Sequence, residues 1–299
     1  MQREVDLLNR VLEQVRNLPS LSHGVTSLLA LSQSDPDLPE KTRTVVESDP
    51  ALAAQILKIA NSAAFSGQQI VDTVERAILR VGVKMIVGTV AQTQLQQSFE
   101  PLDSVTSALW IANVYGANLA LNLASSAKVG VQPETAYTYG LLHDVGRLVL
   151  VRMVGPAMKE LIDEAPSLRT ELCKRERRLY GVDHAVAGRL LGNRWKLPPD
   201  MTLVVAAHHL PADERKAYPA HLNRIIDLLA LCDELVDLAL ARDERWDDVF
   251  AELPARLEDP ALAAIVAAFG LQRGRLEDAL RATAEAVDRQ RQVLGLGAR

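Results

Sequence analysis

Apolar residues recur at helical spacing along nearly the whole chain. In residues 3–17, for example, Val5, Leu8, Leu12 and Val15 fall on one face of a helix. We find no convincing pair of segments in which apolar and polar residues alternate strictly, so no strand pair is predicted. The pattern therefore predicts an all-α fold.

Helix ends are marked by capping residues. Asp49 and Pro50 supply an N-cap carboxylate and a proline at the first helical position, and Gly82 is a natural end for a helix over 74–81. The other predicted helices cover 24–32, 39–48, 50–60, 85–99, 104–126, 134–154, 158–164, 168–180, 183–195, 200–209, 222–241, 261–269 and 273–293. No period of 20–50 residues recurs, which argues against a solenoid.

Composition places the chain among globular proteins. Of its 299 residues 48% are hydrophobic and 24% charged, and the mean hydropathy is +0.03. The uncharged stretch 104–127 is long enough for a membrane span, but its asparagines and hydroxyls would be costly in a bilayer. Charges at residues 3–6 disfavour a signal peptide. Two cysteines, Cys173 and Cys232, fit buried free thiols in a reducing cytosol, so a cytoplasmic protein is expected.

The net charge of −5 argues against a surface that binds nucleic acid throughout. Residues 147–196 nevertheless hold eleven Lys and Arg against six Asp and Glu. Within them lies the basic run Lys174–Arg178, for which a solvated helix face is favoured over nucleic-acid binding.

Imidazoles and carboxylates gather in four otherwise apolar places, the residues being His143, Asp144, His184, His208, His209 and Asp233. This donor set suits Zn, Mn, Fe or Co, bound singly or as a pair. His143 and Asp144 are expected mid-helix, about 100° apart but able to reach one ion beside the helix. His184 follows Asp183, a plausible N-cap, where the helix dipole favours the neutral ring.

Each position also has a plainer explanation. His208 and His209 could stabilise a helix C-terminus as imidazolium, and Asp233 could pair with an arginine such as Arg224. Taken together, in a chain with six histidines, the positions favour a shared cluster. Whether a metal occupies it stays open, and His23 and His221 receive no role.

Several motifs resemble the bacterial HDOD (HD-related output domain) family. They are Leu18–Leu21, Glu47–Leu52, Leu57–Ser62, Ala77–Gly82, Gly140–Gly146, Tyr180–His184, Trp195–Pro198 and His208–His209, in that order. The resemblance runs from about Val5 to the last helix. It implies an N-terminal helical half packed on a half related to HD-type metal phosphohydrolases. It also implies a signalling output or scaffolding role, mostly without catalysis, beside receiver, kinase or cyclic-dinucleotide proteins.

The resemblance further implies a role for each candidate residue. His143 and Asp144 match the central His-Asp pair, and Asp233 matches the closing Asp. His184, His208 and His209 match the extra ligands of two-metal members. The leading His falls at Ala112 or its neighbour Asn113, and Arg147 replaces a phosphate-contacting Lys. The Gly-Tyr-Pro signature of the cyclic-dinucleotide-cleaving branch is absent. The site is therefore expected to be partial or vestigial, with Asp144 and Arg147 as the catalytic candidates if it is active.

We expect three parts: an N-terminal subdomain (1–103), an HD-like subdomain (104–241) and C-terminal helices packed on the same fold (242–299). The first hypothesis is a non-catalytic module that contacts signalling proteins, linked to cyclic-dinucleotide or two-component signalling. The second is a metal-dependent phosphohydrolase acting on a nucleotide or cyclic dinucleotide. A divalent Fe, Mn, Zn or Mg ion is the cofactor to test. No membrane contact is expected, and the last helix covers the core or forms a homo-oligomer.

Overall fold

The computed structural model describes residues 2–31, 36–62, 65, 70–99, 104–126, 128–155, 157–158, 169–241 and 245–294. Every regular element in these ranges is an α-helix. The all-α prediction is confirmed. A single hydrophobic core extends from Val11 to Val287, so the helices are joined by shared packing rather than standing as separate bodies.

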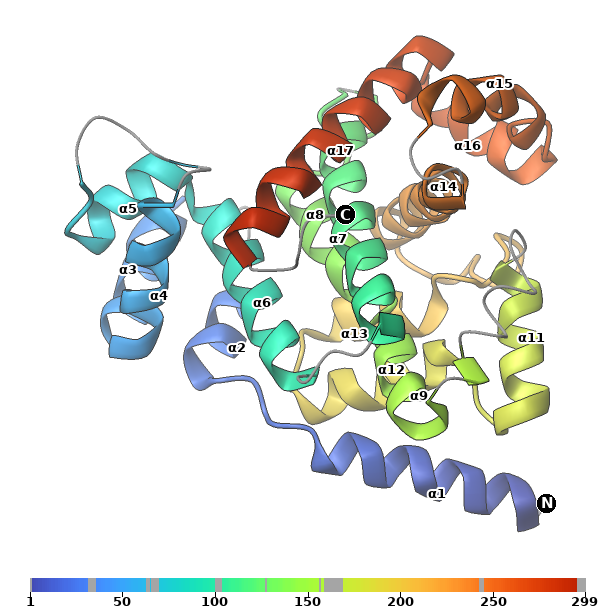
Figure 1. Cartoon of the computed structure of the whole chain (residues 1–299), viewed down its shortest axis with the longest axis horizontal. Helices are drawn as coiled ribbons and strands as arrows, with labels where there is room; N and C mark the ends of the chain where they lie inside the picture. The colour runs from blue at the N-terminus through green and yellow to red at the C-terminus, as the bar shows by residue number, and fades with distance from the viewer. Residues whose placement is uncertain are drawn as a thin grey trace.

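Of the first group of helices, all but the first lie on one side of the molecule, and the first runs along its lower edge (Figure 1). The members of this group are α1 (Gln2–Asn17), α2 (His23–Ala30), α3 (Leu38–Glu47), α4 (Pro50–Ala60), α5 (Val74–Val81) and α6 (Val83–Phe99). Helices α2 to α5 pack on one another and on α6, whereas α1 packs on α9 and α12. Asp49 caps α4 by accepting from Ala51 and Leu52, and Gly82 ends α5 at φ +83°, as the sequence predicts.

The second group surrounds the long helix α7 (Ser104–Ala124). It comprises α8 (Pro133–Leu142), α9 (Val145–Val154), α11 (Arg169–Tyr180), α12 (His184–Arg194), α13 (Pro199–Ala207) and α14 (Ala220–Ala241). Helix α7 contacts α8, α9, α14 and α17, which explains its lack of charge. Its Asn118 satisfies one amide hydrogen on the carbonyl of Val114. None of the described helices has the length and apolarity that a membrane span needs.

Three C-terminal helices complete the fold: α15 (Trp246–Arg256), α16 (Pro260–Phe269) and α17 (Arg273–Leu294). Helix α17 lies along α7 (Figure 1) and buries Leu276, Leu280, Ala284 and Val287. Asn122 of α7 also donates to Thr283 of α17 at 2.9 Å. The apolar face of the last helix therefore covers the core. Helices α15 and α16 pack on α14 instead.

Some sequence predictions concern residues outside these ranges. The helix predicted over 158–164 lies outside the described residues except for Met158, and so do the boundary positions 103 and 242. The division into three parts stays a prediction. Cys173 and Cys232 are both buried thiols and are not joined in a disulfide, as expected.

Candidate metal centre

His143 and Asp144 lie in a break between two helices, not in the middle of one. Helix α8 ends at Leu142 and α9 begins at Val145, so the single helix predicted over 134–154 is wrong. The break coincides with a close crossing of α9 and α12. A Cβ on Gly146 would lie only 1.8 Å from the carbonyl oxygen of His184, so any other residue would clash. At the break, the Asp144 carboxylate faces His184 and His208, whereas the His143 ring faces Asp233 of α14.

His184 is held in a fixed orientation by a buried carboxylate. Asp183 caps α12 by accepting from Val186 at 2.8 Å, as predicted. Glu176 of α11 is fully buried, and its Oε2 accepts from the backbone N–H of His184 at 2.9 Å and from Nδ1 at 2.6 Å. Because Nδ1 gives its hydrogen to Glu176, the other nitrogen, Nε2, faces the cluster. A carboxylate behind an imidazole is the usual support of a metal-binding histidine.

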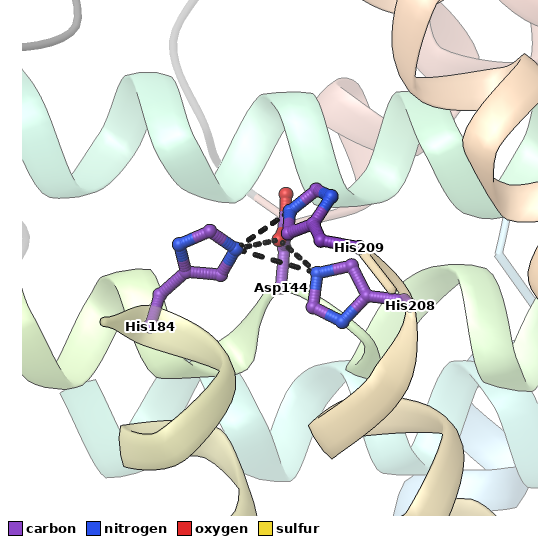
Figure 2. Close-up of side chains that lie close together, drawn as sticks. All are labelled: Asp144, His184, His208 and His209. Atoms are coloured by element: carbon purple, nitrogen blue, oxygen red, sulfur yellow. Dashed lines mark hydrogen bonds and ion pairs between the residues drawn. The ribbon is translucent and has the colours of Figure 1, made fainter. Parts of the chain in front are cut away.

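His208 and His209 follow the last residue of α13. Nδ1 of His208 donates to the carbonyl of Val205 at 2.8 Å, which leaves Nε2 to face Oδ1 of Asp144 at 3.2 Å. Nε2 of His209 lies 2.8 Å from Nε2 of His184. Figure 2 shows the three rings and the Asp144 carboxylate converging on one point.

The spacing of these four groups fits a metal ion. Their donor atoms all lie within 4.8 Å of one another, and the contacts among them measure 2.8–3.3 Å. Ligands about 2.0–2.1 Å from a tetrahedral zinc ion are about 3.3 Å apart. In addition, the nitrogen lone pairs of His184 and His208 face each other and the Asp144 carboxylate. Such an arrangement needs a cation between the groups, either a metal ion or a proton on His184.

His143 belongs to a second, adjacent group with Asp144 and Asp233. Its Nδ1 faces the carbonyl of Gly140 at 2.8 Å, and its Nε2 faces Oδ1 of Asp233 on α14, also at 2.8 Å. Both ring nitrogens therefore have acceptor oxygens. Arg224 does not provide the partner of Asp233 that was considered above, because its guanidinium donates to the carbonyls of Lys128 and Val129.

Helix α7 places Gly116, which has no side chain, beside His143 of this second group. A Cβ on Gly116 would lie 3.8 Å from Cε1 of His143. Ala112 and Asn113, the positions given by the offset from Trp110, lie one turn earlier on the same face. Ala112 is half-buried and Asn113 is buried. None of these three residues can replace the missing histidine as an equally strong ligand.

Neighbouring charges determine which side chains of the centre carry a proton. Burial alone would raise the pKa of Asp144, but the positive charges of Arg147 and His143 and a hydrogen bond from protonated His184 hold this pKa well below its usual value. Burial lowers the pKa of His184, yet the charge of Glu176 outweighs it and raises the pKa well above 6.5. In the absence of a metal, a proton on His184 is thus the cation of the cluster.

The other two histidines are neutral. Burial lowers the pKa of His208, and burial together with the charges of His208 and His184 lowers the pKa of His209 well below 6.5. Imidazolium rings at the C-terminus of α13 are therefore not what stabilises this helix end. Neutral rings are the form that binds metal ions.

Arg147 lies beside Asp144, with Nη1 3.3 Å from Oδ2. The side chain is 8% exposed, and its Nε and Nη2 have no hydrogen-bond partner. A buried guanidinium with two unused donors can donate hydrogen bonds to an oxyanion. The phosphate-contacting role that the resemblance implies stays a prediction.

The basic run on α11 is not uniformly solvated. Lys174 and Arg178 are exposed, but Glu176 is buried under His184 and Arg177 pairs with Asp183 at 2.5 Å. Sequence reasoning missed the role of Glu176. The available signal was its position three residues after Cys173, on the apolar face that also holds Leu172, where a carboxylate needs a buried partner.

Comparisons with known proteins agree on the fold. The structure is similar to a candidate phosphohydrolase from Shewanella amazonensis, with 23% identity, a TM-score of 0.63, and coverage of 95% of this chain and 98% of that one. It is also similar to a candidate signal transduction protein from Marinobacter aquaeolei, with 20% identity, a TM-score of 0.68, and coverage of 98% of this chain and 66% of that one. At these identities the similarity concerns the fold alone.

An uncharacterised protein of Treponema pallidum is 22% identical over 200 residues, which is 67% of this chain but 39% of that protein. The chain thus spans less than half of the length of this relative. The sequence profile of the HDOD domain matches residues 18–211, which run from the end of α1 to just past the two adjacent histidines. The chain therefore belongs to the HDOD domain family.

Proposed function

We propose that this chain is a non-catalytic signal-transduction module that acts through contacts with other proteins. Its HD-type centre then holds one metal ion in a structural role. Membership of the HDOD family supports an output or scaffolding function. The name of the Marinobacter relative points to signalling as well. Receiver, kinase or cyclic-dinucleotide proteins are the partners to test first.

The observation that carries the proposal is the difference between the two ligand groups. Asp144, His184, His208 and His209 supply four protein ligands, and a site closed by four protein ligands is typical of structural zinc. The group of His143, Asp144 and Asp233 has three, with Gly116 of α7 beside His143. A two-metal hydrolase needs both ions to hold the attacking and leaving oxygens. A centre with one complete ligand set lacks that arrangement.

The experiment combines metal analysis with an activity assay. Protein loaded with Mn²⁺, Fe²⁺ or Zn²⁺ should retain about one ion per chain after desalting. The loaded protein should hydrolyse a cyclic dinucleotide or a general phosphodiester no faster than the His143→Ala/Asp144→Ala variant does. Affinity purification from the native cytosol followed by mass spectrometry should recover signalling proteins. Turnover that disappears in the His143→Ala/Asp144→Ala variant would overturn the proposal.

A metal-dependent phosphohydrolase is the second candidate, and two observations favour it. Asp144 belongs to both ligand groups, as a carboxylate shared by two ions would, and the unpartnered nitrogens of Arg147 lie beside it. In that case a bound metal would supply Lewis acidity, and Arg147 would hold the phosphate. Arg147→Gln should then raise the Michaelis constant for a phosphodiester while the metal content stays at the wild-type level.

A further inference from the structure

A pocket of about 930 Å³ lies next to the metal centre. Its floor includes His208 and Asp233, which are only 2% and 3% exposed, so the pocket reaches below the surface. Its walls come from α14, α15, α16 and the segment that follows α13. This volume is within the range of pockets that bind small organic molecules. Because α15 and α16 follow residue 211, most of the walls are made by the part of the chain beyond the HDOD match.

The space exists because many of the side chains that surround it are short. Six of the lining residues are alanines: Ala212, Ala230, Ala255, Ala261, Ala264 and Ala268. Longer side chains at these positions would fill the space, as they do in most protein interiors. Leu210, Leu262 and Ile265 add further apolar surface. The pocket therefore offers mainly apolar contacts.

Helix α16 forms one wall, and its composition fits contact with an apolar ligand. It reads Pro-Ala-Leu-Ala-Ala-Ile-Val-Ala-Ala-Phe, without a charged residue, yet only Leu262 and Phe269 are buried. A helix that is apolar on every side is normally buried on every side. Its Ala264 and Ala268 instead line the pocket and are exposed to solvent. A ligand in the pocket would cover these two residues and remove their apolar surface from water.

The two arginines of the pocket are already paired within the protein. Arg215 is buried and donates to Asp227 and to backbone carbonyls. Arg256 donates to Glu234 at 3.0 Å. Each guanidinium thus has a carboxylate partner that also lines the pocket. An anionic ligand would have to compete with these carboxylates.

The remaining carboxylates of the pocket have partners as well. Oδ1 of Asp233 lies 2.8 Å from Nε2 of His143, and Asp259 caps α16 by accepting from two backbone N–H groups of its first turn. Glu252 is not without a partner either. Every charged side chain among the described residues that line the pocket is therefore matched. A charged ligand would lose its hydration there without gaining an unpaired counter-charge.

We propose that this pocket binds a neutral small molecule with a mainly aliphatic body, such as an alcohol. The apolar walls would cover the body. A hydroxyl group can be accommodated, because a carboxylate that already has one partner still has lone pairs that accept a further hydrogen bond. The proposal goes beyond the scaffold function and does not require a bound metal. It gives the module a small-molecule input beside its metal centre.

The test titrates straight-chain alcohols, from 1-hexanol to 1-octanol, into the full chain and follows binding by calorimetry and amide chemical shifts. Each further buried methylene should raise the affinity about fourfold. The shifts should centre on Ala230, Ala264 and Ile265. Octylammonium and octanoate carry the same chain with a charged head, so each should bind about tenfold more weakly than 1-octanol. Metal-loaded and chelator-treated protein should bind equally, which distinguishes a failure of this proposal from a failure of the metal centre.

A matched pair of double variants locates the binding. Ala264→Trp/Ala268→Trp fills the pocket, whereas Ala263→Trp/Ala267→Trp adds the same bulk to exposed positions of α16 outside it. Only the first variant should bind 1-octanol more weakly, by about tenfold or more, because the apolar contact is lost. Unchanged thermal unfolding confirms that each variant is folded.

Three results would overturn the proposal: an affinity that does not depend on chain length, tighter binding of either ion than of 1-octanol, and full affinity in the filled variant. Sedimentation tests for a different occupant. A dimer of the wild type that dissociates in Ala264→Trp/Ala268→Trp, and not in Ala263→Trp/Ala267→Trp, would place a second copy of the chain at the pocket. That result would also contradict a small-molecule site.

Discussion

Oε2 of Glu176 lies 2.6 Å from Nδ1 of His184, and both side chains are fully buried. This contact fixes which nitrogen of His184 faces the cluster and makes that nitrogen a better metal ligand. It joins α11 to the centre, although the family resemblance gave α11 no part in the site. The centre therefore depends on a residue behind the ligands as well as on the ligands themselves.

Removing the charge of Glu176 should weaken metal binding without removing a ligand. Loss of such a supporting carboxylate typically costs tenfold to a hundredfold in metal affinity. We expect Glu176→Gln to show a decrease of that size in a competition titration with a chelator of known affinity. Glu75→Gln, at an exposed position of α5, is the control and should bind as the wild type does. Equal affinity of the two variants would show that Glu176 does not support the site.

Metal binding should release a proton near neutral pH. The pKa of His184 is raised well above 6.5 in the metal-free protein because the charge of Glu176 outweighs burial, so this ring holds a proton that the metal must displace. The pKa values of His208 and His209 are lowered, so these rings release none. Metal affinity should then fall as the pH falls below the pKa of His184.

Calorimetric titrations in buffers of different ionisation enthalpy measure this release directly. At pH 7 we expect roughly one proton per ion bound. In His184→Ala both the high-affinity binding and the proton release should be lost. Binding of the metal to the wild type with no proton release would contradict this assignment.

The buried pair of His143 and Asp233 should stabilise the fold even if no ion is bound. Removing one partner of a buried charged pair leaves the other uncompensated and typically costs 3–5 kcal/mol. We expect Asp233→Ala to lower the free energy of unfolding of metal-free protein by about 3 kcal/mol in urea. The double variant with His143→Ala should cost less than the sum of the single variants. Additive effects would mean that the two side chains do not interact.

Lys196 is a non-glycine residue with a left-handed backbone, at φ 54°, and it follows the end of α12. Glycine adopts this conformation without the steric cost that a side chain imposes. Lys196→Gly should therefore raise the free energy of unfolding by about 0.5–1 kcal/mol. Lys58→Gly, inside the last turn of α4, should lower it by about 1 kcal/mol. A loss of stability in Lys196→Gly would contradict the expected strain.

The sequence predicts best what local chemistry decides. Asp49, Gly82 and Asp183 were assigned as caps because each acts on neighbouring residues, and the structure confirms all three. The break at His143 and Asp144 was missed because the surrounding run is apolar and continuous. The break accompanies a contact between helices, that of Gly146 with the backbone of His184, which spacing along the chain does not reveal.

The candidate site shows the same limit. His184, His208, His209 and Asp144 were predicted to meet, and their side chains do converge. The sequence did not indicate the role of Glu176, because this residue lies in a basic run in which a carboxylate is expected to be exposed to solvent. The position of Gly116 beside His143 also depends on how α7 and α8 cross. Contacts that arise from tertiary packing cannot be predicted from the spacing of residues along the chain.

The most direct test of the central claim is to locate metal ions by anomalous diffraction from crystals of the metal-loaded protein. The account predicts one strong peak per chain, bound by Asp144, His184, His208 and His209, with His143 still paired to Asp233. Two peaks joined by the Asp144 carboxylate and a bridging water would contradict it, because that arrangement is the centre of a working hydrolase.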